Sequence, residues 1–236
     1  MPMRKDRARA RSRRQRRADR ELVVAMGPKP GPGVVVPTLD ELVDAIEAVD
    51  PDLSWRYARH RVRPVLPRVR PYTLPQDDPI RMVLPPGILV GFGIDIGPAF
   101  VHVTERVRDG WGITIEQVAE QALSNVREYS RACREHVVRE SVADVPVQAF
   151  QSRDGWAGAL LLVPDLLPHF FGEGPYLLIV PMRDLLIALP DDVDPAFAGW
   201  LSDEFASADP NGLRLGGFRY DRGALIPVPL ETAVEA

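Results

Sequence analysis

Short apolar runs that recur in pairs around turn sequences constrain the fold of this 236-residue chain more than any other feature. The paired runs lie at 88–94 and 99–104, at 145–151 and 156–163, at 176–180 and 185–189, and at 213–220 and 224–228. The segments between them, such as Ser152-Arg153-Asp154-Gly155, are rich in residues that favour turns. Two apolar runs joined in this way predict a β-hairpin. We therefore expect antiparallel hairpins through most of the second half of the chain.

Helical segments separate these hairpins. Thr114 and Gln117 have the spacing of a capping box in front of an amphipathic stretch that reaches Cys133. Asp194 followed by Pro195 predicts the start of a second long helix, and a short helix is expected around 165–171. Hairpins alternating with single helices predict an α+β fold, in which two main helices pack on a mostly antiparallel sheet.

Composition divides the chain into three parts. Residues 1–37 combine a basic tail, expected to be disordered, with a linker of glycines and prolines. Residues 38–79 are expected to form a helix that begins at Thr38 and then a proline-rich strap, because seven prolines lie between 64 and 86. The α+β domain itself is predicted to span residues 80–230.

Charge is distributed unevenly along the sequence. Residues 1–72 contain 17 Lys and Arg against 9 Asp and Glu, whereas residues 73–236 contain 12 against 24. A basic segment binds nucleic acid or another anionic partner by displacing counterions from phosphates. A second arginine-rich stretch contains Trp55, Tyr57 and His60, and interleaved aromatic and cationic side chains are typical of surfaces that stack bases.

The candidate anion or nucleic-acid contacts are therefore all arginines: Arg9, Arg11, Arg13, Arg14, Arg16, Arg17, Arg56, Arg59, Arg61 and Arg63. The alternative is that the second stretch is a solvated face at the end of a helix, followed by a connector.

Arg183 and Asp184 interrupt an otherwise apolar run, which makes them candidate ligand or partner contacts. At a hairpin tip, Asp184 is expected to bond the turn backbone while Arg183 faces solvent. The alternative is that Arg183 presents its guanidinium group to an anionic ligand beside the sheet.

The sequence contains none of the common enzyme signatures, including a P-loop, a zinc-binding HExxH helix and a nucleophile elbow. Gly91, Gly93 and Gly97 imitate a dinucleotide fingerprint, but a strand is expected where a helix is required. We expect no catalytic residues, no metal site and no cofactor.

Two catalytic alternatives remain open. A hydrolase would use Asp95, His102 and Glu105, provided that the first hairpin brings the three side chains together. Cys133 is a nucleophile candidate beside His136, although a lone cysteine in an apolar stripe is usually a core residue.

The expected location is the cytoplasm. The single cysteine cannot form an internal disulfide, which fits a reducing compartment. The longest uncharged apolar run, residues 84–94, has 11 residues. A membrane-spanning helix needs about 20, so no membrane span is expected.

Three segments carry a resemblance to a known family. The helix containing Ala122, Leu123 and Asn125, the run Leu160-Leu161-Leu162 and the segment Val180-Pro181-Met182-Arg183-Asp184-Leu185-Leu186 resemble the YtpQ-like family of uncharacterised bacterial proteins. The match covers about residues 87–192 and implies an α+β cytosolic protein of bacteria without an established activity.

The sequence therefore predicts a non-catalytic protein-interaction module whose partner is unknown. The alternative is a nucleic-acid-associated protein that uses its arginine-rich N-terminal extension, and a third hypothesis is an unrecognised hydrolase.

Overall fold

The computed structural model describes residues 53–66, 79–97, 100–133, 137–152, 155–208, 212–213 and 215–230, together with Asp44. The basic tail and the linker predicted for residues 1–37 lie outside this range. Of the helix expected after Thr38, only Asp44 is described, and it is helical.

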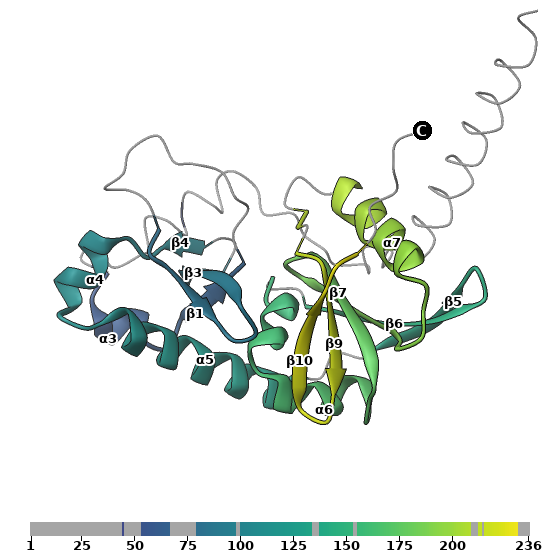
Figure 1. The fold of residues 1–236 in the computed structure, drawn as a ribbon. Helices are drawn as coiled ribbons and strands as arrows, with labels where there is room; N and C mark the ends of the chain where they lie inside the picture. The colour runs from purple at the N-terminus through teal and green to yellow at the C-terminus, as the bar shows by residue number, and fades with distance from the viewer. Residues whose placement is uncertain are drawn as a thin grey trace, which may run out of the picture. The chain divides into compact units, whose positions relative to one another are not determined.

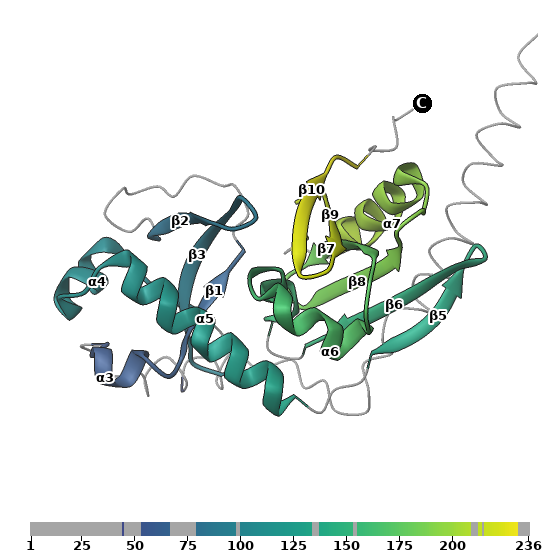
Figure 2. The same ribbon diagram turned by 60° about the horizontal axis from the view of Figure 1, so that its bottom comes forward.

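A four-stranded antiparallel sheet forms the first half of the described chain. Its central strand, β3 (Ile88–Asp95), pairs on one edge with β1 (Val62–Val65) and on the other with β2 (Arg81–Leu84) and β4 (Phe100–His102). Figure 1 shows β4 beside β3, and Figure 2 shows β2 beside β3. The predicted hairpin between β3 and β4 is confirmed.

Helix α5 (Ile115–Ala132) packs against β1 and β3 of this sheet. The predicted capping box is confirmed, since Thr114 and Gln117 each bond the other's backbone N–H through a side chain. Val118, Ala119, Ala122 and Val126 lie on its buried face. Two shorter helices, α3 (Trp55–Ala58) and α4 (Glu105–Trp111), precede α5 in the chain.

The second sheet has six antiparallel strands in the order β10-β9-β7-β8-β6-β5 (Figure 2). Its strands are β5 (Val138–Val142), β6 (Val145–Gln151), β7 (Tyr176–Met182), β8 (Leu185–Pro190), β9 (Gly217–Asp221) and β10 (Ala224–Val228). The predicted hairpins β7–β8 and β9–β10 are confirmed. The predicted second long helix is α7 (Pro195–Ala208), which packs on β7.

The predicted hairpin of 145–151 with 156–163 is wrong. Its second half forms the 3-10 helix η2 (Ala157–Leu162), while β6 pairs with β5 and β8 instead. Ser152 explains the change of direction, because its Oγ accepts hydrogen bonds from the backbone N–H groups of Trp156 and Ala157, both at 2.9 Å. The expected short helix follows, as η3 (Pro164–Leu166) and α6 (Leu167–Phe171).

The predicted α+β fold with mostly antiparallel strands is confirmed, and the strands form two sheets. The first strand, β1, lies before residue 80. The range 80–230 therefore begins too late, since the segment interpreted as a strap starts inside β1 and also includes β2. Pro64 is compatible with β1 because that strand lies at the edge of its sheet, where a missing N–H is tolerated.

Buried side chains from both sheets meet in one hydrophobic cluster, which contains Phe92 of β3 and Phe150 of β6. Every residue of helix η2 is buried, and Gly158 is its tightest position. A Cβ at Gly158 would lie 2.8 Å from Val180 Cγ1 and 2.9 Å from Leu66 Cδ1. Only glycine fits there without displacing two buried side chains.

We predict that Gly158→Ala destabilises the protein by about 1–3 kcal/mol, because overpacking a filled core forces its neighbours to move. Gly110→Ala is the matched control, since a Cβ at that exposed position in α4 meets nothing within 4 Å. It should raise stability by up to about 1 kcal/mol through better helix propensity. Urea unfolding measures both effects, and equal stability of the two variants would contradict the packing described for η2.

Candidate functional site

One face of the four-stranded sheet carries polar side chains above glycines. Gly91 and Gly93 alternate with buried residues along β3 and therefore project to the same face. Arg81 is paired with Gly91, while Arg63 and His102 are both paired with Gly93. Directly paired residues project to the same side of a sheet, so these three side chains share the face of the two glycines. We call it the glycine face.

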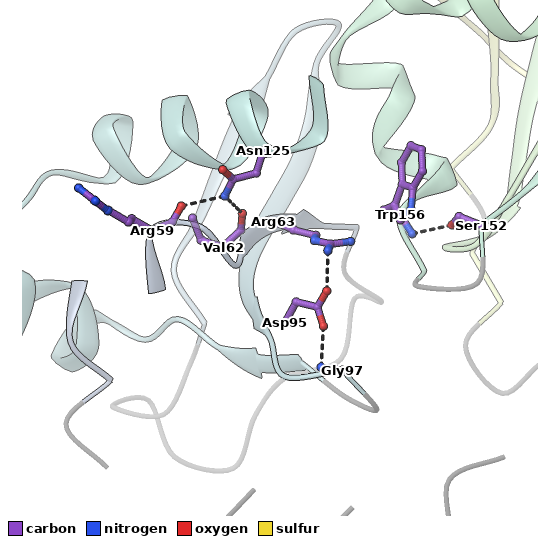
Figure 3. Close-up of polar contacts among 8 residues, drawn as sticks. All are labelled: Arg59, Val62, Arg63, Asp95, Gly97, Asn125, Ser152 and Trp156. Atoms are coloured by element: carbon purple, nitrogen blue, oxygen red, sulfur yellow. Dashed lines mark hydrogen bonds and ion pairs between the residues drawn. The ribbon is translucent and has the colours of Figure 1, made fainter. Parts of the chain in front are cut away.

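Arg63 is the most buried cation on the glycine face, with 7% of its surface exposed. Its Nη2 lies 2.7 Å from Asp95 Oδ2, and its guanidinium carbon lies 4.0 Å from the centre of the Tyr129 ring on α5. The other Asp95 oxygen accepts a hydrogen bond from the Gly97 N–H at 2.8 Å (Figure 3). Arg63 Nη1 is buried and has no hydrogen-bond partner among the described residues.

His102 lies beside two further arginines. Burial lowers the pKa of its imidazole, and the positive charges of Arg183 and Arg81 lower this pKa further. Arg183 belongs to the turn between β7 and β8 and donates from Nε to the Leu66 carbonyl oxygen at 3.0 Å. The charges of Arg81, from β2, and of Arg183, from the β7–β8 turn, thus disfavour the protonated form of the imidazole.

The β7–β8 turn differs from the expected solvated hairpin tip. Arg183 is partly buried, and its carbonyl oxygen accepts a hydrogen bond from the Gly158 N–H at 2.9 Å. The Asp184 carboxylate accepts from the Gln151 side chain at 3.0 Å, and its backbone oxygen accepts from the Ser152 N–H at 2.9 Å. The turn is therefore held by β6 and η2, and the orientation expected for Arg183 is corrected.

The remaining arginines of the second stretch are exposed. Arg56, Arg59 and Arg61 lie on or just after α3, and the Arg61 guanidinium carbon lies 4.2 Å from the centre of the Tyr57 ring. Arg61 Nη1 also donates to the Tyr57 carbonyl oxygen at 3.0 Å. Arg63 belongs to a different environment, so the four arginines do not form one surface.

The amide of Asn125 connects α5 to the segment that carries these arginines. Its Nδ2 donates to the carbonyl oxygens of Arg59 at 2.9 Å and Val62 at 2.7 Å (Figure 3). Asn125 is buried, and its Oδ1 accepts a hydrogen bond from Gln121. This role of Asn125 was not predicted from the sequence, although a polar residue directly before Val126 of the apolar stripe could have indicated a buried hydrogen bond.

The arginines predicted in the tail cannot be placed. Arg9, Arg11, Arg13, Arg14, Arg16 and Arg17 all lie outside the described residues.

The side chains proposed for a hydrolase either make structural contacts or are exposed to solvent. Both carboxylate oxygens of Asp95 serve structural contacts, to Arg63 and to Gly97. Glu105 is exposed in the first turn of α4. Cys133 follows the last residue of α5, and His136 lies outside the described residues.

Within the described ranges, no three His, Cys, Asp or Glu side chains gather as metal ligands would. Their helices also include none that is both long and apolar enough to cross a membrane. Comparison of the chain with family models, with curated proteins and with solved structures finds no match.

We predict that His102 makes folding depend on pH. Its folded pKa lies below the ordinary value of 6.5, so the unfolded chain takes up a proton on this residue more readily. The folding stability that depends on a neutral His102 is therefore fully present above about pH 6.5 and is lost as the pH falls through that value. Urea unfolding between about pH 7.5 and 5.5 should show a smaller loss of stability in His102→Gln than in the wild type. Equal losses would contradict the buried environment of His102.

Proposed function

We propose that this protein is a non-catalytic protein-interaction module that binds an acidic segment of its partner. The observation that carries the proposal is that Arg56, Arg59 and Arg61 are all exposed on or just after α3, with Arg61 stacked on the Tyr57 ring. Stacking on the ring and bonding to the Tyr57 carbonyl fix the orientation of Arg61 before any partner arrives. Such preorganisation reduces the entropy lost on binding.

A binding role is supported by the use of polar side chains elsewhere in the described chain. Asn125 donates to two backbone carbonyls, and Ser152 caps the start of η2. The two carboxylate oxygens of Asp95 bond Arg63 and the Gly97 N–H. Each of these groups stabilises the fold through a specific contact. General acid–base catalysis instead needs side chains positioned toward a reacting group.

The aromatic side chains favour an acidic protein partner over a single-stranded nucleic acid. One face of Tyr57 is covered by Arg61, and the Trp55 ring packs against Trp111 at a centroid distance of 5.0 Å. Base stacking requires open ring faces, whereas an acidic peptide needs only accessible cations.

Binding of nucleic acid through phosphates remains the second candidate. It is supported by the ten basic residues among the first 20 of the sequence, which require no ring for counterion release.

Two broader assignments are also proposals. The single cysteine supports a location in the cytoplasm. The apolar segments shared with the YtpQ-like family support membership of that group of bacterial proteins.

The test measures binding of the full chain to a fluorescent oligoglutamate peptide, to single-stranded RNA and to duplex DNA. Arg59→Gln/Arg61→Gln should weaken peptide binding about tenfold, since exposed charge pairs contribute up to about 1 kcal/mol each. Arg139→Gln/Arg222→Gln removes the same charge from exposed positions elsewhere and should leave the affinity within about twofold.

Equal weakening by both double variants would contradict a specific surface at α3. Binding of RNA or DNA without peptide binding, with a steep decrease between about 50 and 200 mM salt, would support the nucleic-acid candidate instead.

A further inference from the structure

Strand β5 forms an open edge of the six-stranded sheet (Figure 2). Among the described residues it pairs only with β6, and four of its five residues are exposed. An open edge offers N–H and C=O groups that can bond an incoming strand. We propose that β5 binds an extended segment of a protein partner, which adds to the sheet as an antiparallel strand and places a basic residue opposite Glu140.

The turn between β5 and β6 determines which backbone groups of β5 face outward. Ala143–Asp144 is a two-residue turn in which both residues have positive φ, as a type I′ turn requires. The residues that flank such a turn, Val142 and Val145, form a hydrogen-bonded pair, and hydrogen-bonded positions alternate along an antiparallel strand. Arg139 and Ser141 therefore direct their N–H and C=O groups away from β6.

The opposite edge of the same sheet is protected by a proline. Strand β10 also follows a two-residue turn with positive φ, Arg222–Gly223, so its outward-facing residues are Leu225 and Pro227. Proline has no N–H and blocks the addition of a strand at an edge. Since β5 contains no proline, it is the edge of this sheet that can accept a strand.

The exposed side chain of Glu140 decides between a second copy of this chain and a different strand. In an antiparallel pair of two β5 strands, Arg139 of each copy would bond Ser141 of the other, which places Glu140 directly opposite its own copy. Directly opposed Cβ atoms lie about 4.5–5.5 Å apart, so two like charges at this position are destabilising. A strand with lysine or arginine there instead makes a favourable cross-strand pair. The occupant is therefore a partner strand with a basic residue.

The neighbours of Glu140 specify the rest of this strand. Val138 projects to the same face as Glu140 and is 50% exposed, so an apolar β-branched residue opposite it would cover it. Arg139 projects to the other face, where its Nε donates to Gln148 Oε1 at 3.1 Å, and its charge disfavours a basic residue opposite it. The expected pattern is valine, threonine, lysine, threonine, valine, with the lysine opposite Glu140.

Fluorescence anisotropy of the full chain with the labelled peptide Ser-Val-Thr-Lys-Thr-Val-Ser tests this proposal. The control peptide Ser-Val-Thr-Thr-Lys-Val-Ser has the same composition and charge, but with its valines in the same positions it places the lysine opposite Arg139. We expect saturable binding of the first peptide and about tenfold weaker binding of the second. Equal affinities, or no saturable binding of either peptide, would overturn the proposal.

Methylation of the peptide backbone tests strand addition without changing the protein. A methyl group on the nitrogen of the first threonine removes the N–H that would bond Ser141, so it should weaken binding about tenfold. The lysine N–H points away from β5, and its methylation should leave the affinity within about twofold. Equal effects of the two methyl groups would contradict the backbone pairing.

Ser141→Pro removes an outward N–H from the protein at an edge position, where proline is tolerated, and should weaken peptide binding about tenfold or more. Arg59→Gln/Arg61→Gln should leave this affinity within about twofold, which separates the test from that of the α3 surface. Sedimentation velocity of the chain without peptide gives its oligomeric state. A dimer that Ser141→Pro dissociates would identify a second copy as the occupant and overturn the proposal.

Discussion

The buried guanidinium group of Arg63 fixes the strand that directly follows the exposed arginines of α3. It pairs with Asp95 on β3 and lies over the Tyr129 ring on α5, so one side chain links the edge strand β1 to the central strand and to the long helix. Asn125 strengthens the same junction through the carbonyls of Arg59 and Val62. Because a charge in this environment must be paired, the position of β1 is strongly specified.

The arginines of this short segment are of two kinds, exposed and buried. Arg59 and Arg61 lie before β1 and are exposed, whereas Arg63 lies on the glycine face and is buried. Exposed arginines contribute mainly to long-range attraction and to partner choice. Arg63 instead uses its charge within the fold, where it pairs with Asp95 and packs on the Tyr129 ring. The arginine-rich stretch is therefore better understood as exposed arginines followed by one buried arginine that stabilises the fold.

The sequence predicted the elements whose local signals agree with their tertiary environment. The capping box at Thr114 and the apolar stripe of α5 are examples, as are the hairpins β7–β8 and β9–β10. It failed for η2, because a continuous apolar run fits a buried strand and a buried helix equally well. Strand β5 was missed because four of its five residues are exposed and carry no apolar alternation. The environment of His102 was not predictable either, since it depends on strand register and on Arg183, which lies more than 80 residues further along the chain.

The central claim is that Arg63 and Asp95 form a coupled pair that fixes β1 within the fold. A double-mutant cycle with Arg63→Met, Asp95→Asn and the double variant, followed by urea unfolding, tests this claim most directly. The account predicts a coupling free energy on the order of 2 kcal/mol, because each single variant leaves a buried polar partner behind. Single-variant effects that sum to that of the double variant within about 0.5 kcal/mol would contradict it.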